Sequence, residues 1–245
     1  MMEKLEAQHV CYKKENPILS DFSFTFEKPL YGIISNRNEE NSNILKILAG
    51  LLNPDSGSVL LDGRNVFTSF QKKERVIRKQ IGFVFQSGGL LSNLNVLENL
   101  LVPYDFHFPD VSREEKLEKI LIYLNGFGLS ESILSERPAK LTISVRKALL
   151  FIRTYIVDPK IIFYDDPLMN CSQQVQRSIF EMILKLKEEK TIQIFCETVD
   201  AQMYKLADEV ILFNEGELYS SSSFSELKNS NSDFVTGLIL KLFAE

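Results

Sequence analysis

The 245-residue sequence contains no tryptophan, two histidines and three cysteines, and it has no run of about 20 apolar residues. Without such a run, no segment is expected to span a bilayer. The start, MMEKLEAQHV, lacks the apolar core of a signal peptide, which predicts a cytoplasmic location. The cysteines, Cys11, Cys171 and Cys196, are far apart in the sequence, which favours three separate thiols over a metal site.

The sequence also lacks an excess of basic residues. Its 28 Lys and Arg residues against 33 Asp and Glu residues give a net charge of −5. This acidic balance argues against a nucleic-acid partner, because binding to the phosphate backbone depends on Lys and Arg. With 44% apolar and 25% charged residues, the composition is that of an ordinary globular domain.

A strand, a loop and a helix are predicted between residues 30 and 52. Residues 30–34, LYGII, predict a short buried strand, and residues 44–52, ILKILAGLL, predict a helix that ends near Gly50. The loop between them, residues 35–43, reads SNRNEENSN. This order is the context of the phosphate-binding motif G-x-x-x-x-G-K-[ST], but the loop has neither glycine nor lysine.

The helix and the residues after it resemble the ATP-binding cassette (ABC) family. Residues 44–66 read ILKILAGLLNPDSGSVLLDGRNV, where the family reads LLKILAGLLxPDSGxVxLDGxxI. In this register the family's phosphate-loop positions fall, in order, on Ser35, Asn38, Glu40, Asn41, Ser42 and Asn43. Only Ser42 has the family's residue, because the first three replace glycines, Asn41 replaces the lysine and Asn43 replaces the threonine. The resemblance therefore implies a vestigial nucleotide site.

These substitutions are unfavourable for ATP. Glycines let the loop backbone turn its N–H groups toward phosphates, and the lysine supplies a positive charge that Asn41 lacks. Glu39 and Glu40 instead place carboxylates at a helix N-terminus, where a phosphate would bind. Like charges about 4 Å apart cost on the order of 4 kcal/mol at an effective dielectric constant near 20, which lowers affinity about a thousandfold. No nucleotide cofactor is therefore expected.

The resemblance extends to both sides of this loop. Residues 1–30 alternate as two or three antiparallel strands do, and Tyr12 falls where the family stacks an aromatic ring on adenine. Tyr12 is either a retained adenine platform or a packing residue. Residues 81–86, IGFVFQ, predict a buried strand that ends at Gln86. Gln86 stands at the family's Q-loop position, which contacts magnesium and the attacking water.

The family's signature motif, LSGGQ, is replaced as well. The family places it eighteen residues before the proline that precedes the Walker B strand, and counting back from Pro159 gives LTISV. These residues are Leu141, Thr142, Ile143, Ser144 and Val145. In the family this loop contacts the γ-phosphate held by the opposite subunit, an approach that Ile143 and Val145 would block. Thr142 remains able to cap the helix that follows.

Residues 159–167, PKIIFYDDP, resemble the Walker B strand. Four apolar residues predict a buried strand, and Asp165 follows at its carboxyl end, where open α/β sheets bind ligands. If Mg-ATP binds, the resemblance makes Ser42, Gln86 and Asp165 the metal-binding residues. Asp166 replaces the family's catalytic glutamate, and its shorter side chain misplaces a water by about 1 Å, which costs about 100-fold in rate.

Two further family positions are altered downstream. Ser172 stands where the D-loop of the family has an aspartate. Thr198 stands where the family has the switch histidine that holds the γ-phosphate, and it neither carries a positive charge nor shuttles a proton. We therefore expect little or no ATP hydrolysis by this chain, which would be a catalytically degenerate cassette.

Residues 85–107, FQSGGLLSNLNVLENLLVPYDFH, indicate a substrate class. They resemble FQxGALFxxxNVxxNVxxPL in the ABC subunits of Mla/Mce-type lipid transporters, whereas ABC proteins in general share only FQ and V-x-x-N. This resemblance implies phospholipid transport, with another ABC branch as the alternative. In either branch the apolar residues of this segment predict an amphipathic helix.

The resemblance covers nearly the whole chain and implies an α/β fold of the ABC-type P-loop NTPase class. That fold has a RecA-like mixed sheet core, an N-terminal antiparallel β subdomain and an inserted α-helical subdomain. It predicts one domain over residues 1–245, with a core lobe over 1–86 and 158–218, a helical subdomain over 87–157 and a C-terminal extension over 219–245. The last helix either reaches a neighbouring subunit or covers its own domain.

Three interpretations of function follow. The first is an ABC-cassette subunit of a membrane transporter that acts as a non-hydrolysing scaffold on the cytoplasmic face of the inner membrane. Its partners would be a transmembrane permease subunit and a second ABC subunit, identical or different. The second is an atypical ATPase that binds and slowly hydrolyses ATP, and the third is a free-standing regulatory module. Nucleotide binding separates the first two, and copurification with a permease separates the first from the third.

Overall fold

The computed structural model describes residues 4–67, 75–198 and 202–243. Its strands are β1 (Leu5–Lys13), β2 (Pro17–Phe26), β3 (Leu30–Ser35), β4 (Ser56–Leu61), β5 (Arg64–Asn65), β6 (Ile81–Val84), β7 (Ile161–Asp165), β8 (Ile192–Cys196), β9 (Glu209–Asn214) and β10 (Glu217–Ser222). They form a small antiparallel sheet of order β2-β1-β4-β5 and a large mixed sheet of order β10-β9-β3-β8-β7-β6. Within the large sheet only β10 runs antiparallel to its neighbour.

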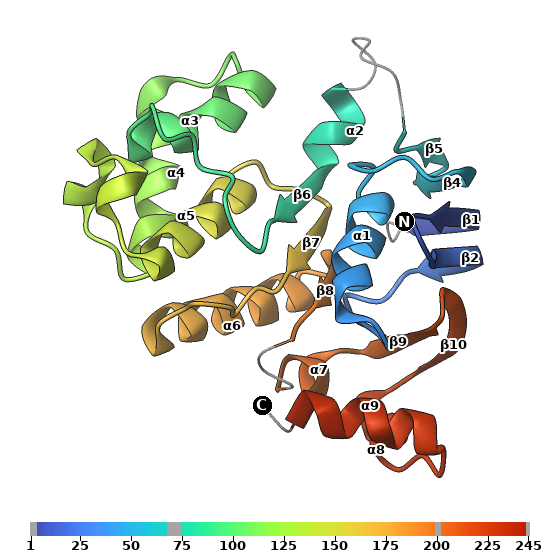
Figure 1. Cartoon of the computed structure of the whole chain (residues 1–245). Coiled ribbons are helices and arrows are strands. Elements are labelled where there is room, and N and C mark those ends of the chain that lie inside the picture. The colour runs from blue at the N-terminus through green and yellow to red at the C-terminus, as the bar shows by residue number, and fades with distance from the viewer. Residues whose placement is uncertain (1–3, 68–74, 199–201, 244–245) are drawn as a thin grey trace.

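Helices surround the large sheet (Figure 1). They are α1 (Asn38–Leu48), α2 (Arg75–Gln80), α3 (Val96–His107), α4 (Arg113–Gly126), α5 (Ile143–Tyr155), α6 (Gln173–Glu188), α7 (Gln202–Leu206), α8 (Phe224–Lys228) and α9 (Asp233–Phe243). In Figure 1, α3, α4 and α5 lie together on one side of the molecule, and α1 lies between the two sheets. Within the described ranges, none of the helices has the length and apolar character needed to cross a bilayer.

The central strands of the large sheet are buried on both faces. In β7, Ile161 and Phe163 join the cluster that contains α1 and the small sheet, whereas Ile162 and Tyr164 join the cluster that contains α5 and α6. Helices on both faces of a parallel sheet require such continuous apolar runs. The mixed sheet, the antiparallel β subdomain and the inserted helices confirm the predicted fold class.

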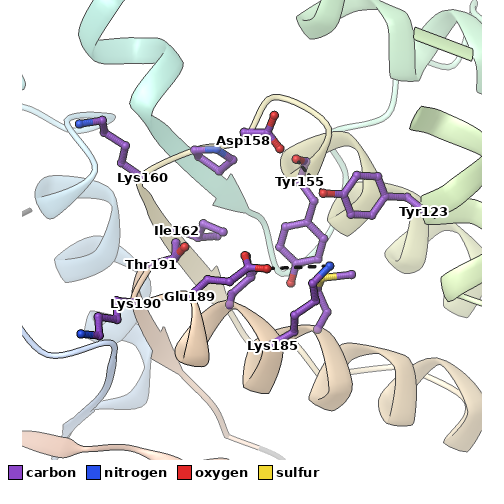
Figure 2. Close-up of a pocket in the computed structure, with 12 residues that line it drawn as sticks. Tyr123, Tyr155, Asp158, Lys160, Ile162, Lys185, Glu189, Lys190 and Thr191 are labelled. Carbon is purple, nitrogen blue, oxygen red and sulfur yellow. Dashed lines mark hydrogen bonds and ion pairs between the residues drawn. The ribbon is translucent and has the colours of Figure 1, made fainter. Parts of the chain in front are cut away.

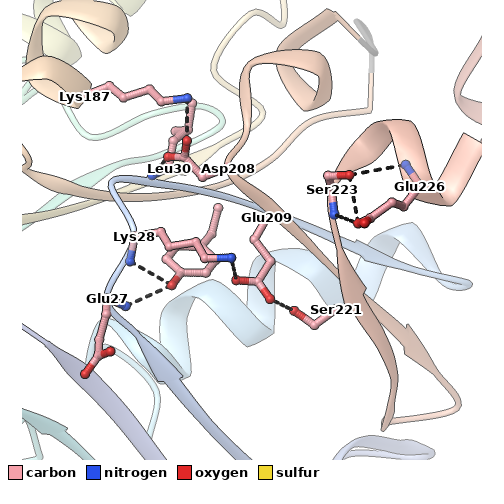
Figure 3. Close-up of polar contacts among 10 residues, drawn as sticks. Glu27, Lys28, Leu30, Lys187, Asp208, Glu209, Ser221, Ser223 and Glu226 are labelled. Atoms are coloured by element: carbon pink, nitrogen blue, oxygen red, sulfur yellow. Dashed lines mark hydrogen bonds and ion pairs between the residues drawn. The ribbon is translucent and has the colours of Figure 1, made fainter.

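Ion pairs connect the start of β3 to β9 and to α6 (Figure 3). Lys28, just before β3, pairs with Glu209 at 2.8 Å, and the pKa of Lys28 is raised chiefly by its hydrogen bond to that carboxylate. Asp208 pairs with Lys187 at 2.8 Å and also accepts a hydrogen bond of 3.0 Å from the backbone N–H of Leu30. These contacts fix β3 beside β9, and they thereby place the loop that follows β3.

The C-terminal helix α9 packs on its own domain. Val235, Leu238 and Ile239 are buried in the same apolar cluster as α5 and α6, whereas Leu240 points outward and is 63% exposed. Packing on its own domain, one of the two alternatives predicted for this helix, is therefore present in the structure. The preceding α8 starts with a capping box in which Ser223 and Glu226 exchange hydrogen bonds (Figure 3).

Candidate functional site

The candidate site lies at the carboxyl edge of the large sheet. The parallel strands β3, β7 and β8 end there at Ser35, Asp165 and Cys196, and α1 begins beside them. Ligands of open α/β sheets bind at this edge, because loops and helix N-termini converge outside the carboxyl ends of the strands. The topology therefore brings several predicted site residues close together.

The loop after β3 is shorter than predicted. α1 begins at Asn38, so residues 38–43 are helical and not loop, and Arg37 takes the N-cap position. The hydroxyl of Ser35 donates to the carbonyl of Arg37 at 2.6 Å, and the N–H of Glu40 donates to the same carbonyl at 2.9 Å. Glutamates favour a helix, and no glycine is present to interrupt it, which explains the early start. The amide of Glu40 is therefore engaged inside the protein.

Glu40 and Asn41 are buried where the family has glycine and lysine. They are 7% and 3% exposed. Oε1 of Glu40 pairs with Arg37 at 2.9 Å, whereas Oε2 of Glu40 and Oδ1 of Asn41 have no hydrogen-bond partner among the described residues. The side chains of Asn38 and Glu39 lie outside the described part of the structure. Buried acceptor oxygens repel phosphate oxygens, so this arrangement does not fit a triphosphate.

Ser42 and Asp165, two of the predicted magnesium residues, contact each other directly. The hydroxyl of Ser42 donates to Oδ2 of Asp165 at 2.6 Å, and the thiol of Cys196 lies 3.5 Å from Oδ1. Burial raises the pKa of Cys196 well above its ordinary value, so the thiol stays protonated and can donate. In the part of the chain that the structure describes, no three His, Cys, Asp or Glu side chains gather in a metal-binding arrangement.

Asp166 receives three hydrogen bonds from two other predicted site residues. The side-chain amide of Gln86 donates to Oδ2 at 2.8 Å, and Thr198 donates to Oδ1 through its N–H at 2.8 Å and its hydroxyl at 2.7 Å. Burial raises the pKa of Asp166, and the hydrogen bonds from Thr198 oppose that shift. The structure thus joins the Q-loop, Walker B and switch positions in one hydrogen-bonded cluster.

Lys147 is a site residue that the sequence analysis did not identify. Its ammonium donates to the backbone carbonyls of Phe85 and Gln86 at 3.0 Å each, of Asp166 at 2.9 Å and of Asp165 at 3.4 Å. Lys147 is only 4% exposed, and this burial lowers its pKa. The signal in the sequence was its spacing, because Lys147 shares one face of a predicted helix with Phe151 and Thr154, both of which are buried.

The signature residues lie at the start of α5. The hydroxyl of Thr142 accepts a hydrogen bond from the N–H of Val145 at 3.3 Å, which confirms the predicted N-cap. Leu141 and Val145 are partly buried against the large apolar cluster, whereas Ile143 is 57% exposed. An exposed Ile143 side chain covers the first turn of the helix, where the family presents a bare backbone.

Ser144 contacts the segment after Walker B within the same chain. Its hydroxyl donates to the hydroxyl of Ser172 at 3.1 Å and accepts from the N–H of Ser172 at 2.9 Å. Ser172 also caps α6, since its hydroxyl accepts from the N–H of Val175 at 3.4 Å. Signature and D-loop positions are therefore joined to each other, and no hydrogen bond that the structure describes joins Ser144 to Asp166.

Tyr12 stands apart from this cluster. It is half-buried on β1, opposite Leu19 of β2, and packs against the apolar cluster around α1. The ammonium of Lys14, in the turn after β1, lies 3.5 Å from Oδ1 of Asn43 on α1. Lys14 therefore connects the small sheet to α1. Tyr12 has a packing role in the apolar cluster, whether or not it also contacts a ligand.

The two asparagines of N-V-x-x-N both have local structural roles. Asn95 caps α3, where it exchanges hydrogen bonds of 2.8 Å and 2.7 Å with Glu98. Asn99 is buried, and it accepts from the N–H of Leu91 at 2.7 Å and donates to the carbonyls of Leu91, Leu94 and Asn95. Capping and loop bonding thus account for these two residues without reference to the transported substrate.

A cavity of about 590 Å³ lies at the opposite edge of the large sheet (Figure 2). It is lined by Tyr123 of α4, Tyr155 of α5, Lys185 of α6 and the segments before β7 and β8, and by none of the predicted site residues. A second cavity, of about 440 Å³, borders Gln86, Ile143 and Lys147 beside the candidate site. Of these two cavities in the described part of the chain, the second borders the candidate site.

Comparisons with known proteins agree with this architecture. A family profile described as ABC transporter matches residues 41–169, more than half of the chain. HrtA of Staphylococcus haemolyticus, named as a hemin import ATP-binding protein, is 29% identical over 83% of this chain and 91% of that protein. The methionine import ATP-binding protein MetN of Chlamydia caviae is 26% identical over 82% of this chain, which spans only 60% of that protein.

Solved structures show the same fold. A dimeric, post-hydrolysis structure of the ATP-binding cassette MJ0796 with ADP and Pi has a TM-score of 0.80 at 23% identity, over 89% of this chain and 98% of that chain. An ATP-binding subunit of an ABC transporter has a TM-score of 0.81 at 16% identity, over 98% of this chain and 99% of that chain. The profile match and these likenesses lead to one conclusion: the chain belongs to the ABC transporter family, as an ATP-binding domain.

Proposed function

We propose that this chain is an ABC-cassette subunit of a membrane transporter that neither binds nor hydrolyses ATP and acts as a scaffold. The observation that carries the proposal is the burial of Glu40 and Asn41 at the positions of a phosphate-loop glycine and the lysine. Glu40 and Asn41 therefore place acceptor oxygens where the family has a glycine backbone and a lysine ammonium to bind phosphate. The chain would function as a single domain, with its helical subdomain inserted between two parts of the core lobe.

Several contacts support the loss of catalysis. Ser42 and Asp165 satisfy each other, and Gln86 and Thr198 occupy both oxygens of Asp166. Hydrogen bonds donated to a carboxylate stabilise its charged form, so the three that Asp166 accepts inside the protein make it a weaker general base toward a substrate water. The exposed side chain of Ile143 would further hinder contact with a phosphate on another subunit.

A second candidate is an atypical ATPase that binds and slowly hydrolyses ATP. The observation in its favour is that Ser42, Gln86, Asp165, Asp166 and Thr198 still meet in one place. In this case Mg-ATP would have to open the Ser42–Asp165 contact and tolerate Glu40. Steady-state phosphate release by the purified chain, compared with its Asp166→Asn variant, separates the candidates, because only a slow enzyme would lose activity on substitution.

Phospholipid is the transported substrate that we propose, on the basis of F-Q-S-G-x-L with N-V-x-x-N in residues 85–99. The relatives described above are named for hemin and methionine import, which are alternatives for this chain. The test is to purify the transporter with its membrane partner and to identify small molecules bound to it by mass spectrometry. Enrichment of phospholipid over empty-membrane controls would support the proposal, and enrichment of hemin or methionine would contradict it.

The proposed partners are a transmembrane permease subunit and a second ABC subunit, met at the cytoplasmic face of the inner membrane. Four apolar side chains are exposed on α3, on α4 and in the segment before α3, and we propose that they form part of an interaction surface. They are Leu91, Val102, Phe106 and Ile122. A coupling helix of the permease would dock there.

A copurification experiment tests this partner. Phe106→Asp should lower the amount of permease recovered with the tagged chain, because a carboxylate would enter an apolar contact. Leu184→Asp, at an exposed apolar position on α6, is the matched control and should leave recovery unchanged. Equal recovery with both variants would exclude this docking surface, and no recovery with the wild-type chain would favour the free-standing module.

A further inference from the structure

Lys147 joins two parts of the molecule that are distant in sequence. It lies on α5, whereas its four acceptor carbonyls belong to the segment after β6 and to the end of β7. An ammonium has three N–H donors, so four acceptors within 3.4 Å use its full capacity. Buried charges of this kind are stable only when their hydrogen bonds are satisfied. These four carbonyl groups, called the carbonyl cage below, therefore surround a cation that belongs to the same chain.

A second cation of α5 holds the far end of the same segment. The guanidinium of Arg153 donates to the carbonyl of Gly89, a glycine in the left-handed region with a φ of 88°. A Cβ at this position would approach Arg153 to 3.1 Å, so the segment passes close to α5. Residues 85–89 are thus bonded to α5 at their start through Lys147 and at their end through Arg153.

The cage also sets the side chains of the candidate site. Lys147 binds the carbonyls of Gln86 and Asp166, and the side chains of these residues bond to each other at 2.8 Å. The backbone of both partners is fixed by one ammonium, and so their side-chain contact is preorganised. All of these contacts join groups of the same chain.

We propose that Lys147 is a positioning residue whose ammonium holds residues 85–89 and the end of β7 against α5. It thereby fixes the helical subdomain relative to the large sheet, and it does so whether or not nucleotide is bound. The role goes beyond the scaffold proposed above, because it states what keeps the cassette in one conformation. It also predicts that Mg-ATP does not change the mobility of residues 85–89.

Hydrogen exchange of the full-length chain, followed by mass spectrometry, tests this role. In Lys147→Met, which keeps the length of the side chain but has no donor, exchange should accelerate on the order of tenfold or more in peptides covering 85–89 and 165–168, because the backbone there loses the ammonium that anchors it and opens locally more often. The exchange rate of peptides from β1 and β2 should be the same in the variant as in the wild type. Lys185→Met, at an exposed lysine of α6, is the matched control and should resemble the wild type. Lys147→Gln, which retains two donors, should be intermediate.

The results separate a positioning role from a general structural one. Equal acceleration in every peptide of Lys147→Met, or no acceleration at 85–89, would overturn the proposal. If Lys147→Met does not fold, Lys147→Gln carries the test, and its exchange at residues 85–89 should be faster than in the wild-type chain. In the wild-type chain, exchange at residues 85–89 should have the same rate with and without millimolar Mg-ATP. Slower exchange at residues 85–89 on adding Mg-ATP would overturn the proposal that their position does not depend on nucleotide. Binding of Mg-ATP without that change would refute only the non-binding scaffold and leave the role of Lys147 standing.

Discussion

The hydroxyl of Ser42 donates a 2.6 Å hydrogen bond directly to the carboxylate of Asp165. These are two of the residues that the ABC resemblance assigns to magnesium, and here each is the other's partner. Asp166, the next residue, is likewise occupied by Gln86 and Thr198. The polar groups at this edge of the sheet are thus bonded largely to one another, and the exceptions, on Glu40 and Asn41, are acceptors that phosphate cannot satisfy.

Restoring charge in the phosphate loop should restore affinity for nucleotide. Glu40→Gln combined with Asn41→Lys removes the carboxylate and supplies the missing cation, so we expect calorimetry to show Mg-ATP binding at least about tenfold tighter than the millimolar limit up to which the wild type gives no heat. The matched control, Glu118→Gln with Asn125→Lys, makes the same charge change at exposed positions of α4 and should give no gain. A gain in both double variants would mean that net charge, not the loop, governs affinity.

Asp166→Asn should change the pH dependence of stability. Burial raises the pKa of Asp166 in the folded chain, so this carboxyl favours folding most at acid pH, and its contribution falls as the pH rises through the folded-state pKa. Asparagine does not ionise. The free energy of unfolding of the variant, relative to the wild type, should therefore increase as the pH rises above about 4, the ordinary pKa of an aspartate, in urea titrations. A difference that stays constant or decreases over this range would contradict the prediction.

Asn99→Ala should destabilise the segment before α3. The substitution removes the buried amide of Asn99 and leaves the carbonyls of Leu91 and Leu94 without their side-chain donor, which costs about 1–3 kcal/mol in the free energy of unfolding. Asn125→Ala, at an exposed position on α4, should stay within about 0.5 kcal/mol of the wild type in the same denaturation experiment. Equal stability of the two variants would show that the Asn99 contacts contribute nothing.

The packing of α9 can be tested with two leucines of the same helix. Leu238→Ala removes a buried side chain and should cost about 2 kcal/mol or more in the free energy of unfolding. Leu240→Ala changes a largely exposed side chain and should cost less than about 0.5 kcal/mol. Thermal unfolding of the two variants at equal protein concentration compares them. A larger loss for Leu240→Ala would place the contact surface of α9 on another molecule.

Local pattern was sufficient for much of the fold. The apolar run of β7 predicted a buried strand with Asp165 at its carboxyl end, and Thr142 was correctly predicted as an N-cap. The prediction of a loop over residues 35–43 was wrong, because the motif's context was taken to imply its geometry. Without glycines the backbone has no reason to leave the helix, and α1 starts at Asn38.

The role of Lys147 could not be derived from the sequence. Its acceptors are backbone carbonyls at residues 85, 86, 165 and 166, and a backbone carbonyl has the same chemistry in every residue. The sequence therefore does not indicate which carbonyls a buried lysine will meet. Only the convergence of the carboxyl ends of β6 and β7 beside α5 brings them within reach. Lys147 shares one face of α5 with Phe151 and Thr154, and this spacing does not specify its hydrogen-bond partners.

Titration of Mg-ATP into the purified chain by calorimetry, up to millimolar nucleotide and with and without the membrane partner, tests the central claim most directly. The burial of Glu40 and Asn41 predicts no heat of binding in either case. Binding tighter than about 0.1 mM, equivalent to about −5.5 kcal/mol, would contradict the account, because the phosphate loop would then accommodate a triphosphate despite its carboxylate.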